Sequence, residues 1–188
     1  MNPRLLIDFL WLVFATVWLV TAPRASPAVR RESMMSGLPH RAALALCGLL
    51  LFRGTGAFIL PAWRFVPDTP LTGWIGVAVA LPGLALAIVA RFFLGRNWSG
   101  AVTVKEQHEL IRRGPYSAVR HPIYSGVLAG ILGTAIVIGE VRGLIAVFFA
   151  VLGLRLKSRR EEQFMEEEFG AEYRDYKRRV KALIPLVW

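Results

Sequence analysis

The chain has 188 residues, 55% of them apolar, and a mean hydropathy of +0.47. This composition is too apolar for an ordinary soluble domain and predicts one integral membrane domain. The formal net charge of +10 does not indicate a nucleic-acid partner, because most basic residues flank apolar stretches, where contact with membrane lipids explains them. The single cysteine, Cys47, excludes an internal disulfide and a cysteine metal site.

The N-terminal half contains three apolar stretches close to the roughly 20 residues that cross a bilayer as a helix. They cover residues 5–22, 42–60 and 73–94. Arg53 lies within the second stretch and Arg91 near the end of the third. Because an arginine facing lipid is costly, we expect both side chains to face a polar interior or to reach the membrane interface.

Two shorter apolar runs follow, at residues 122–139 and 144–156, and two glycines mark a turn between them. We expect a tight helical hairpin here. The charged tail is predicted to form two helices, at residues 159–169 and 171–180, with Gly170 in the left-handed conformation as the stop signal between them. The sequence therefore predicts an all-α polytopic membrane protein with about five transmembrane helices and a helical C-terminal tail.

The distribution of basic residues predicts the orientation of these spans. Five crossings place residues 24–41, residues 95–121 and the tail on the same side, and this side carries 18 of the 23 Lys and Arg residues. The opposite side carries three. Because positive residues are enriched in cytoplasmic loops, we expect the loop and the tail to face the cytoplasm of a multi-pass protein in an inner or plasma membrane.

The polar loop before the fourth span ends in Arg120, His121 and Pro122, and Tyr124 follows one turn into the span. A proline can begin a helix without loss of a backbone hydrogen bond, and the free N–H groups beside Arg120 attract a carboxylate. The alternative is that Arg120 and His121 anchor the helix to headgroups while Tyr124 belongs to an aromatic belt. The residues alone favour neither.

Glu161 and Glu162 follow the last apolar run. Adjacent carboxylates do not share a helix face, so we expect one to point into the protein and the other toward water. The inward carboxylate could hold a cationic amino group or ribose hydroxyls. The alternative is a solvated charged helix, whose ion pairs contribute only about 0.5 kcal/mol each.

The sequence offers little support for a metal site or for the motifs of other enzyme classes. The chain has three histidines, including His108, and they are too dispersed to predict a metal site. No metalloprotease, phosphate-loop or serine-elbow motif is present. The glycines at residues 54–56 and 130–133 are predicted to serve close packing between membrane helices.

Several of these motifs occur in a known combination in the C-terminal half: His108 to Tyr116, Arg120 to Gly126, Glu161-Glu162, Phe169-Gly170, Tyr173, Tyr176, Val180 and Pro185. In this combination the chain resembles the isoprenylcysteine carboxyl methyltransferase family, and it is similar to the related phospholipid N-methyltransferases. The resemblance implies a membrane-embedded enzyme that takes S-adenosylmethionine from the cytoplasm and a lipophilic or prenylated acceptor from the bilayer.

The resemblance also implies roles for individual residues. Residues 1–188 would form one methyltransferase domain, with three spans in residues 1–94 and the cofactor loop, hairpin and charged helices in residues 95–188. Arg120, Arg155 and Glu162 would be catalytic, the two arginines facing a carboxylate of the acceptor or the cofactor. The residues implied to bind the cofactor are His108, Leu110, Tyr116, His121, Tyr124, Glu161 and Glu162. No metal is implied.

Three alternatives remain at this point. The acceptor could be a phospholipid amine. The chain could also be an NADPH-dependent reductase, because sterol reductases end in a similar Arg-His-Pro-x-Tyr pattern. The third alternative is a membrane scaffold without catalytic activity, whose charged tail binds membrane lipids or a partner. The sequence predicts no particular oligomeric state.

Overall fold

The structure is a computed structural model that describes the chain except for residues 1, 25–27, 53–62, 99–102, 106–108 and 184–188. Its main elements are helices and two short strands: α1 (Pro3–Thr21), β1 (Ala28–Arg31), α2 (Met34–Phe52), α3 (Pro70–Leu94), β2 (Thr103–Lys105), α4 (Pro122–Ile138) and α5 (Val141–Arg179). The described residues also form three short 3-10 helices: η1 (Ala22–Arg24), η3 (Gly95–Asn97) and η4 (Gly114–Ser117).

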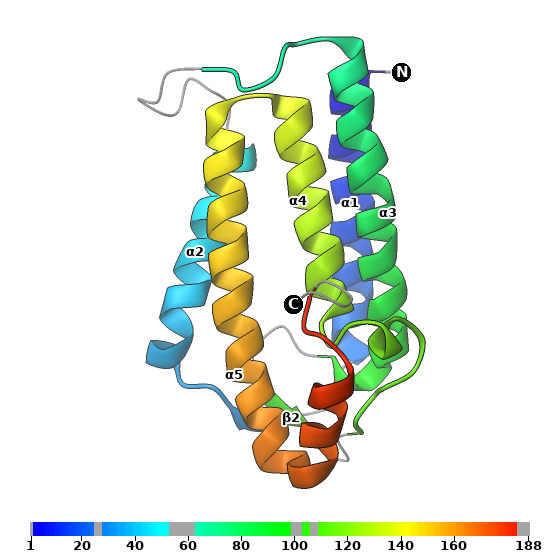
Figure 1. Ribbon diagram of the computed structural model, residues 1–188, viewed down its shortest axis with the longest axis vertical. Coiled ribbons are helices and arrows are strands. Elements are labelled where there is room, and N and C mark those ends of the chain that lie inside the picture. The colour runs from blue at the N-terminus through cyan, green and yellow to red at the C-terminus, as the bar shows by residue number, and fades with distance from the viewer. Residues whose placement is uncertain (1, 25–27, 53–62, 99–102, 106–108, 184–188) are drawn as a thin grey trace.

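The helices form a bundle that confirms the predicted helical membrane architecture (Figure 1). α4 packs between α3 and α5, α1 lies against α3, and α2 lies against α5. Among the described residues, three helices are long and apolar enough to cross a membrane: α1, α2 and α3 with the turn that follows it. α4 is shorter, at 17 residues, and the apolar first part of α5 runs beside it. The count of five crossings stays a prediction.

Large apolar side chains cover the outside of the bundle. Leu19 on α1, Leu71 on α3 and Phe148 on α5 are 75%, 70% and 61% exposed. Exposed apolar side chains on several helices at once are costly in water and suit hydrocarbon. This surface therefore faces the bilayer in an integral membrane protein.

Glycines bring α3 and α4 into close contact. Gly76 lies opposite Gly133, and Gly83 lies opposite Gly126. A Cβ atom at Gly76 would lie only 2.5 Å from the backbone oxygen of Gly133. Small residues are favoured at such crossings because they let backbones approach closely within the membrane. The predicted packing role of residues 130–133 is confirmed, whereas residues 54–56 lie outside the described residues.

Gly133→Ala is expected to lower the free energy of unfolding by about 2–3 kcal/mol, because the added methyl group meets the backbone of α3 at Gly76 and Ala80. Gly48→Ala on α2 is the matched control, since a Cβ atom at Gly48 meets nothing within 4 Å, and it should be neutral or stabilise by up to about 1 kcal/mol. Denaturant titration of both variants in detergent micelles measures the difference. Equal effects would contradict close packing of α3 against α4.

The predicted hairpin between α4 and α5 is confirmed. α4 ends at Gly139, whose φ of 71° and ψ of 5° are left-handed, and its N–H donates to the carbonyl of Ala135 at 2.8 Å. α5 begins two residues later. Arg142 in its first turn pairs with Glu140 at 2.7 Å and donates to the carbonyl of Leu50 at 2.6 Å. The turn is thereby joined to α2.

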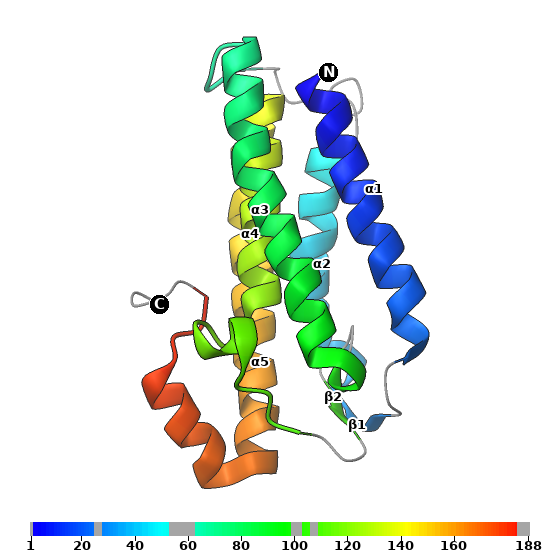
Figure 2. The ribbon, with the colours of Figure 1, turned by 90° about the vertical axis from the view of Figure 1, so that its right-hand side faces the viewer.

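The sequence predicted an apolar run at residues 144–156 followed by two separate tail helices. In the structure, α5 includes all three segments. Its apolar first half continues without interruption into the charged segment, as far as Gly170. There the predicted interruption occurs, and the chain folds back beside the rest of α5 (Figure 2). The backbone of Gly170 has φ 51° and ψ −119°, so the prediction of left-handed α geometry was wrong. This conformation still favours glycine, because φ is positive.

A two-stranded antiparallel sheet was not predicted from the sequence. β1 pairs with β2, with Arg31 opposite Thr103 and Ala28 opposite Lys105. Each strand is only three or four residues long. The sheet ties the segment between α1 and α2 to the segment after α3, at the end of the bundle where α5 carries its charged half (Figure 2).

Arg91 illustrates how the bundle accommodates an arginine in a membrane helix. Its side chain is buried, and it donates to the carbonyls of Gly95 at 2.9 Å and Thr21 at 2.8 Å. Its guanidinium carbon lies 4.3 Å from the centre of the Trp98 ring. These contacts confirm that Arg91 avoids lipid, and they join the ends of α1 and α3. Arg53 lies outside the described residues.

Candidate functional site

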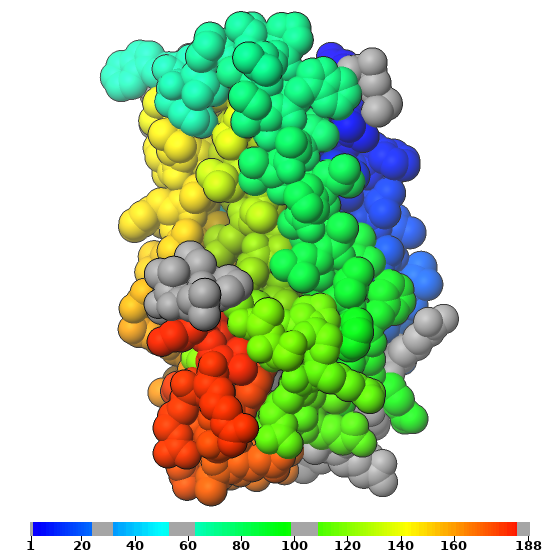
Figure 3. Space-filling model, turned by 45° about the vertical axis from the view of Figure 1, so that its right-hand side comes forward, coloured from blue at the N-terminus to red at the C-terminus, as the bar shows by residue number. Residues whose placement is uncertain are grey.

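The C-terminal segment holds the Arg120-His121 motif through the backbone. The N–H of Arg120 donates to the carbonyl of Lys181 at 2.8 Å, and the N–H of His121 donates to the carbonyl of Ala182 at 2.9 Å. Ser125, in the first turn of α4, donates through its hydroxyl to the carbonyl of Leu183 at 2.5 Å. Figure 3 shows the C-terminal helix lying directly against the segment that precedes α4.

The Arg120 side chain joins the part of α5 before Gly170 to the part after it. Its Nε and Nη2 donate to Oε1 of Glu162 at 2.9 and 2.6 Å. Its Nη1 donates to the carbonyls of Lys177, at 3.3 Å, and Val180. All three guanidinium nitrogens are thus engaged within the protein. Arg120 therefore holds the helix after Gly170 against the helix before it.

Glu162 is the centre of an ion-pair cluster and is only 8% exposed. Besides Arg120, its Oε1 lies 3.2 Å from Nε2 of His121, and its Oε2 lies 3.1 Å from Nζ of Lys177. Burial by itself raises the pKa of this carboxyl, but the hydrogen bonds from His121 and Arg120 outweigh burial and lower the pKa from 4.5 to about 2. Glu162 is therefore a carboxylate at neutral pH.

Glu161 has a different set of neighbours. Tyr124 donates its hydroxyl to Oε1 of Glu161 at 2.5 Å. Nδ1 of His121 lies 3.6 Å from Oε2, and Nζ of Lys157 lies 4.0 Å from Oε1. The rings of His121 and Tyr124 are stacked, with centroids 5.4 Å apart. The Glu161 side chain is 24% exposed, against 11% for Glu162. As expected of one member of the pair, Glu162 points into the protein, and the more accessible Glu161 faces a cavity.

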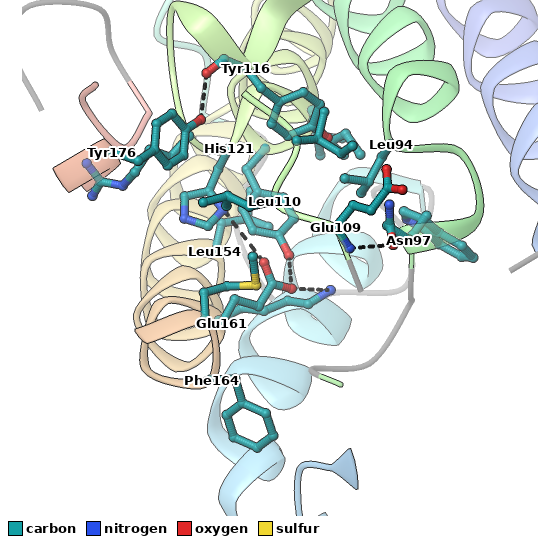
Figure 4. A pocket seen from close by; sticks show the side chains of 18 of the residues that line it. Leu94, Asn97, Glu109, Leu110, Tyr116, His121, Leu154, Glu161, Phe164 and Tyr176 are labelled. Carbon is teal, nitrogen blue, oxygen red and sulfur yellow. Dashed lines mark hydrogen bonds and ion pairs between the residues drawn. The ribbon is translucent and has the colours of Figure 1, made fainter. Parts of the chain in front are cut away.

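A cavity of about 410 Å³ opens beside Glu161 (Figure 4). Its polar wall includes Glu161, Lys157 and Asn97. Its apolar wall is built from membrane helices and includes Phe14 and Trp18 of α1. Small-molecule sites are typically cavities of about this size with a mainly apolar lining and a few polar groups. This cavity therefore has the character of a binding site for a ligand with both polar and apolar parts.

A second cavity, of about 300 Å³, shares Arg120 with the first and is also lined by Arg155 and Glu162. The two neighbouring glutamates thus line different cavities. Successive residues on a helix point about 100° apart, which explains how α5 directs Glu161 to the first cavity and Glu162 to the second.

Most of the site residues expected from the sequence meet in this region. Those that line the larger cavity are Leu110, Tyr116, Arg120, His121, Tyr124 and Glu161. In the part of the chain that the structure describes, Arg155 and Glu162 line only the second cavity. His108 lies outside the described residues. Within those residues, no three His, Cys, Asp or Glu side chains gather as a potential metal site.

The sequence did not identify the contribution of the N-terminal spans. Phe14 and Trp18 of α1 and Trp98 after α3 line the larger cavity. They lie more than 60 residues from Glu161 in the sequence, and aromatic residues in or beside apolar spans are too common to mark a site. Lys157 is not distinguished by the sequence pattern either, because it stands among several basic residues. Its spacing of four residues from Glu161 was the available signal.

Two tyrosines of the C-terminal helix face the site. Tyr173 and Tyr176 are buried, at 2% and 6% exposure, and the Tyr176 hydroxyl donates to the carbonyl of Tyr116 at 2.5 Å (Figure 4). Their spacing of three residues places both side chains on one face of the helix. This face packs against the loop before α4.

Tyr176→Phe is expected to lower the free energy of unfolding by about 1–2 kcal/mol, because it leaves the buried carbonyl of Tyr116 without its partner. Tyr173→Phe removes the same atom from the same helix, and among the described residues the Tyr173 hydroxyl donates no hydrogen bond. It should therefore cost less. Thermal unfolding in detergent compares the two variants, and an equal or larger effect at Tyr173 would contradict this account.

Comparisons with known proteins agree with the geometry. A family model described as phospholipid methyltransferase matches residues 71–172, which is more than half of the chain. The chain is 28% identical over 149 residues to a probable protein-S-isoprenylcysteine O-methyltransferase of Oryza sativa subsp. indica, covering 77% of this chain and 75% of that protein. It is 30% identical over 131 residues to protein-S-isoprenylcysteine O-methyltransferase B of Arabidopsis thaliana, covering 65% of this chain and 66% of that protein.

A solved structure supports the fold. The eukaryotic intramembrane Ras methyltransferase named isoprenylcysteine carboxyl methyltransferase matches with a TM-score of 0.60 and 22% identity, over 100% of this chain and 69% of that chain. At this identity the likeness concerns the fold. The sequence matches favour the methyltransferase interpretation over the reductase and scaffold alternatives. The chain belongs to the phospholipid methyltransferase family and is an integral membrane methyltransferase.

Proposed function

We propose that this protein transfers a methyl group from S-adenosylmethionine to the carboxylate of a lipophilic acceptor, such as a prenylated cysteine. The observation that carries the proposal is the larger cavity, which joins a polar wall around Glu161 to an apolar wall of membrane helices. Residues 1–188 would act as one methyltransferase domain, with residues 1–94 forming the membrane scaffold and residues 95–188 contributing most of the polar groups.

The cavity lining fits S-adenosylmethionine. This donor carries an amino group, a carboxylate, ribose hydroxyls and a positively charged sulfur. The Glu161 carboxylate is suited to the amino group or the hydroxyls, and the Lys157 ammonium is suited to a carboxylate. Leu110, Tyr116 and Tyr124 supply apolar and aromatic surface for the nucleoside. His108, which lies outside the described residues, stays a predicted contact.

The chain's role in the reaction is to bind, align and exclude water. S-adenosylmethionine supplies a methyl group on sulfur; the C–S bond breaks as a C–O bond forms to the acceptor carboxylate, and no proton has to move. Opposite charges disappear in this step, so the partly apolar lining favours it. Holding both reactants in line lowers the barrier further. Arg120 contributes by holding the parts of α5 before and after Gly170 together beside the cavity.

The apolar wall supports entry of the acceptor from the bilayer. Phe14 and Trp18 belong to α1, which is mostly exposed on its outer face, and Val127 belongs to α4. A prenyl chain bound there would keep its hydrocarbon in an apolar environment while its cysteine carboxylate approaches the positively charged sulfur of the donor. The names of the rice and Arabidopsis relatives support an isoprenylcysteine acceptor. The excess of basic residues supports a cytoplasmic site.

A phospholipid amine is the second candidate acceptor, because the matching family model carries the description phospholipid methyltransferase. An amine must lose a proton during the reaction, and His121 or Glu161 at the cavity wall could accept it. The two acceptors give chemically different products: a carboxyl methyl ester is cleaved by mild base, whereas an N-methyl group is not.

The test uses the full chain in nanodiscs with S-adenosylmethionine carrying a labelled methyl group. It is offered an S-farnesylated cysteine derivative in one reaction and phosphatidylethanolamine in the other. We expect labelled, base-labile product from the first. Base-stable product from the second alone would move the acceptor to the phospholipid amine. Saturable binding of NADPH without binding of S-adenosylmethionine would overturn the proposal.

A further inference from the structure

The second cavity is lined mainly by positively charged side chains. Its volume is about 300 Å³, and it lies across the Arg120–Glu162 ion pair from the larger cavity. Its lining contains five cationic side chains and one carboxylate: Arg120, Arg155, Arg159, Lys177, Lys181 and Glu162. Glu166 adds a second carboxylate by its contact with Lys177 at 2.7 Å. The described lining therefore contains more cations than carboxylates.

The excess is concentrated in side chains outside the ion-pair cluster. Arg120 and Lys177 are compensated by Glu162 and Glu166. Within the described part of the chain, Arg159 and Lys181 form no ion pair. Like charges gathered around one cavity repel each other, so an anion bound between them would be favoured. The larger cavity, in contrast, combines cations with Glu161 and apolar walls.

Two segments supply these cations. Arg155 and Arg159 are four residues apart on one face of α5, whereas Lys177 lies in the last turn of α5 and Lys181 in the extended segment that follows it. Guanidinium groups match the geometry of phosphate oxygens, and lysine ammonium groups add charge. The cavity therefore suits a phosphate better than a single carboxylate.

The location suits a phosphate at the membrane surface. Arg155 and Arg159 follow directly on the apolar first part of α5, where this helix leaves the bundle core. Basic residues at such a level contact anionic lipid headgroups, each contributing roughly 1 kcal/mol. We propose that the second cavity binds a phosphate group, carried either by an anionic phospholipid or by a soluble phosphate compound. This proposal does not depend on the methyl acceptor or donor.

The cavity is connected to the methyltransferase site. The backbone carbonyls of Lys181 and Ala182, two of its lining residues, accept hydrogen bonds from Arg120 and His121. A phosphate that holds Lys181 against Arg159 would also hold this segment against the motif. Occupation of the second cavity therefore stabilises the wall of the first one.

Native mass spectrometry of the full chain in detergent tests the proposal, with phosphatidylglycerol, phosphatidylcholine and inorganic pyrophosphate as separate probes. The cavity variant is Arg159→Gln with Lys181→Gln. The matched control is Arg174→Gln with Arg178→Gln, which removes the same charge from exposed positions of the C-terminal helix outside the cavity. Thermal unfolding verifies that each variant is folded, and Arg159→Lys is a milder variant that keeps the charge.

We expect phosphatidylglycerol to bind at least tenfold more tightly than phosphatidylcholine, whose choline cation the cavity repels. The cavity variant should lose this preference, the control should keep it, and Arg159→Lys should be intermediate. Pyrophosphate binding with the same dependence on the variants, without a lipid preference, would support a soluble phosphate as the occupant. Equal losses in the cavity variant and the control, or no saturable binding of any probe, would overturn the proposal.

Discussion

Glu161→Gln is expected to weaken binding of S-adenosylmethionine by about 30-fold and to lower methyl transfer at least as much. The substitution keeps the size of the side chain but removes the charge that faces the larger cavity. A hydrogen bond to a charged group contributes about 1.5–3 kcal/mol, which corresponds to roughly 10- to 150-fold in affinity. Because the amide can still accept the Tyr124 hydrogen bond, folding should change little. Isothermal calorimetry in detergent measures the binding constant.

Glu168→Gln is the control for this experiment, since Glu168 is an exposed carboxylate seven residues further along the same helix. It should bind S-adenosylmethionine like the unmodified protein. Unchanged binding in Glu161→Gln as well would remove Glu161 from the donor site. A loss of folding in Glu161→Gln, detected by thermal unfolding, would assign it a structural role instead.

Glu162→Gln is expected mainly to lower the free energy of unfolding. The pKa of Glu162 is lowered from 4.5 to about 2 in the folded protein, so its carboxylate form is favoured by folding. A difference of this size corresponds to about 3 kcal/mol of unfolding free energy. Since the folded pKa is depressed, this contribution is fully present above about pH 4.5 and is lost as the pH falls toward 2. The variant should lose it at every pH above that window.

The measurement is denaturant titration in detergent at several pH values between 5 and 2. The unmodified protein should lose stability on acidification through this window, whereas Glu162→Gln should be less stable at pH 5 and show a flatter profile. Asp175→Asn is the control, because Asp175 pairs with Arg178 and Arg179 at the surface, where ion pairs contribute little. Parallel pH profiles for the unmodified protein and Glu162→Gln would contradict the buried cluster.

The two glutamates thus test separate roles. Glu161 touches the larger cavity, and we propose that it contacts the donor. Glu162 has its oxygens engaged by Arg120, His121 and Lys177, and we propose that it positions the motif. We therefore propose a positioning role for Glu162 in place of the catalytic role expected from the sequence. Arg155 is likewise better placed for the second cavity than for a carboxylate in the first.

Much of the architecture was predictable because it depends on local sequence. Apolar length predicts membrane helices, and α1 and α3 follow the first and third apolar stretches. α2 spans Met34–Phe52 and coincides with the second predicted stretch only at residues 42–52, because its first turns contain polar residues that hydropathy does not mark. The hairpin at Gly139 was predictable because a glycine between two apolar runs adopts positive φ at little cost. The combination of motifs around Arg120 and the glutamate pair was also sufficient to suggest the family.

The arrangement of the site, in contrast, depends on contacts between residues that are distant in the sequence. The backbone pairing of Arg120 with Lys181 joins residues 61 positions apart, and no local pattern encodes it. The same holds for the strand pair β1–β2, for Trp18 at the cavity, and for the division of Glu161 and Glu162 between two cavities. Hydropathy and helix propensity describe single segments, so the sequence determined which helices form, whereas packing between them decided which side chains meet.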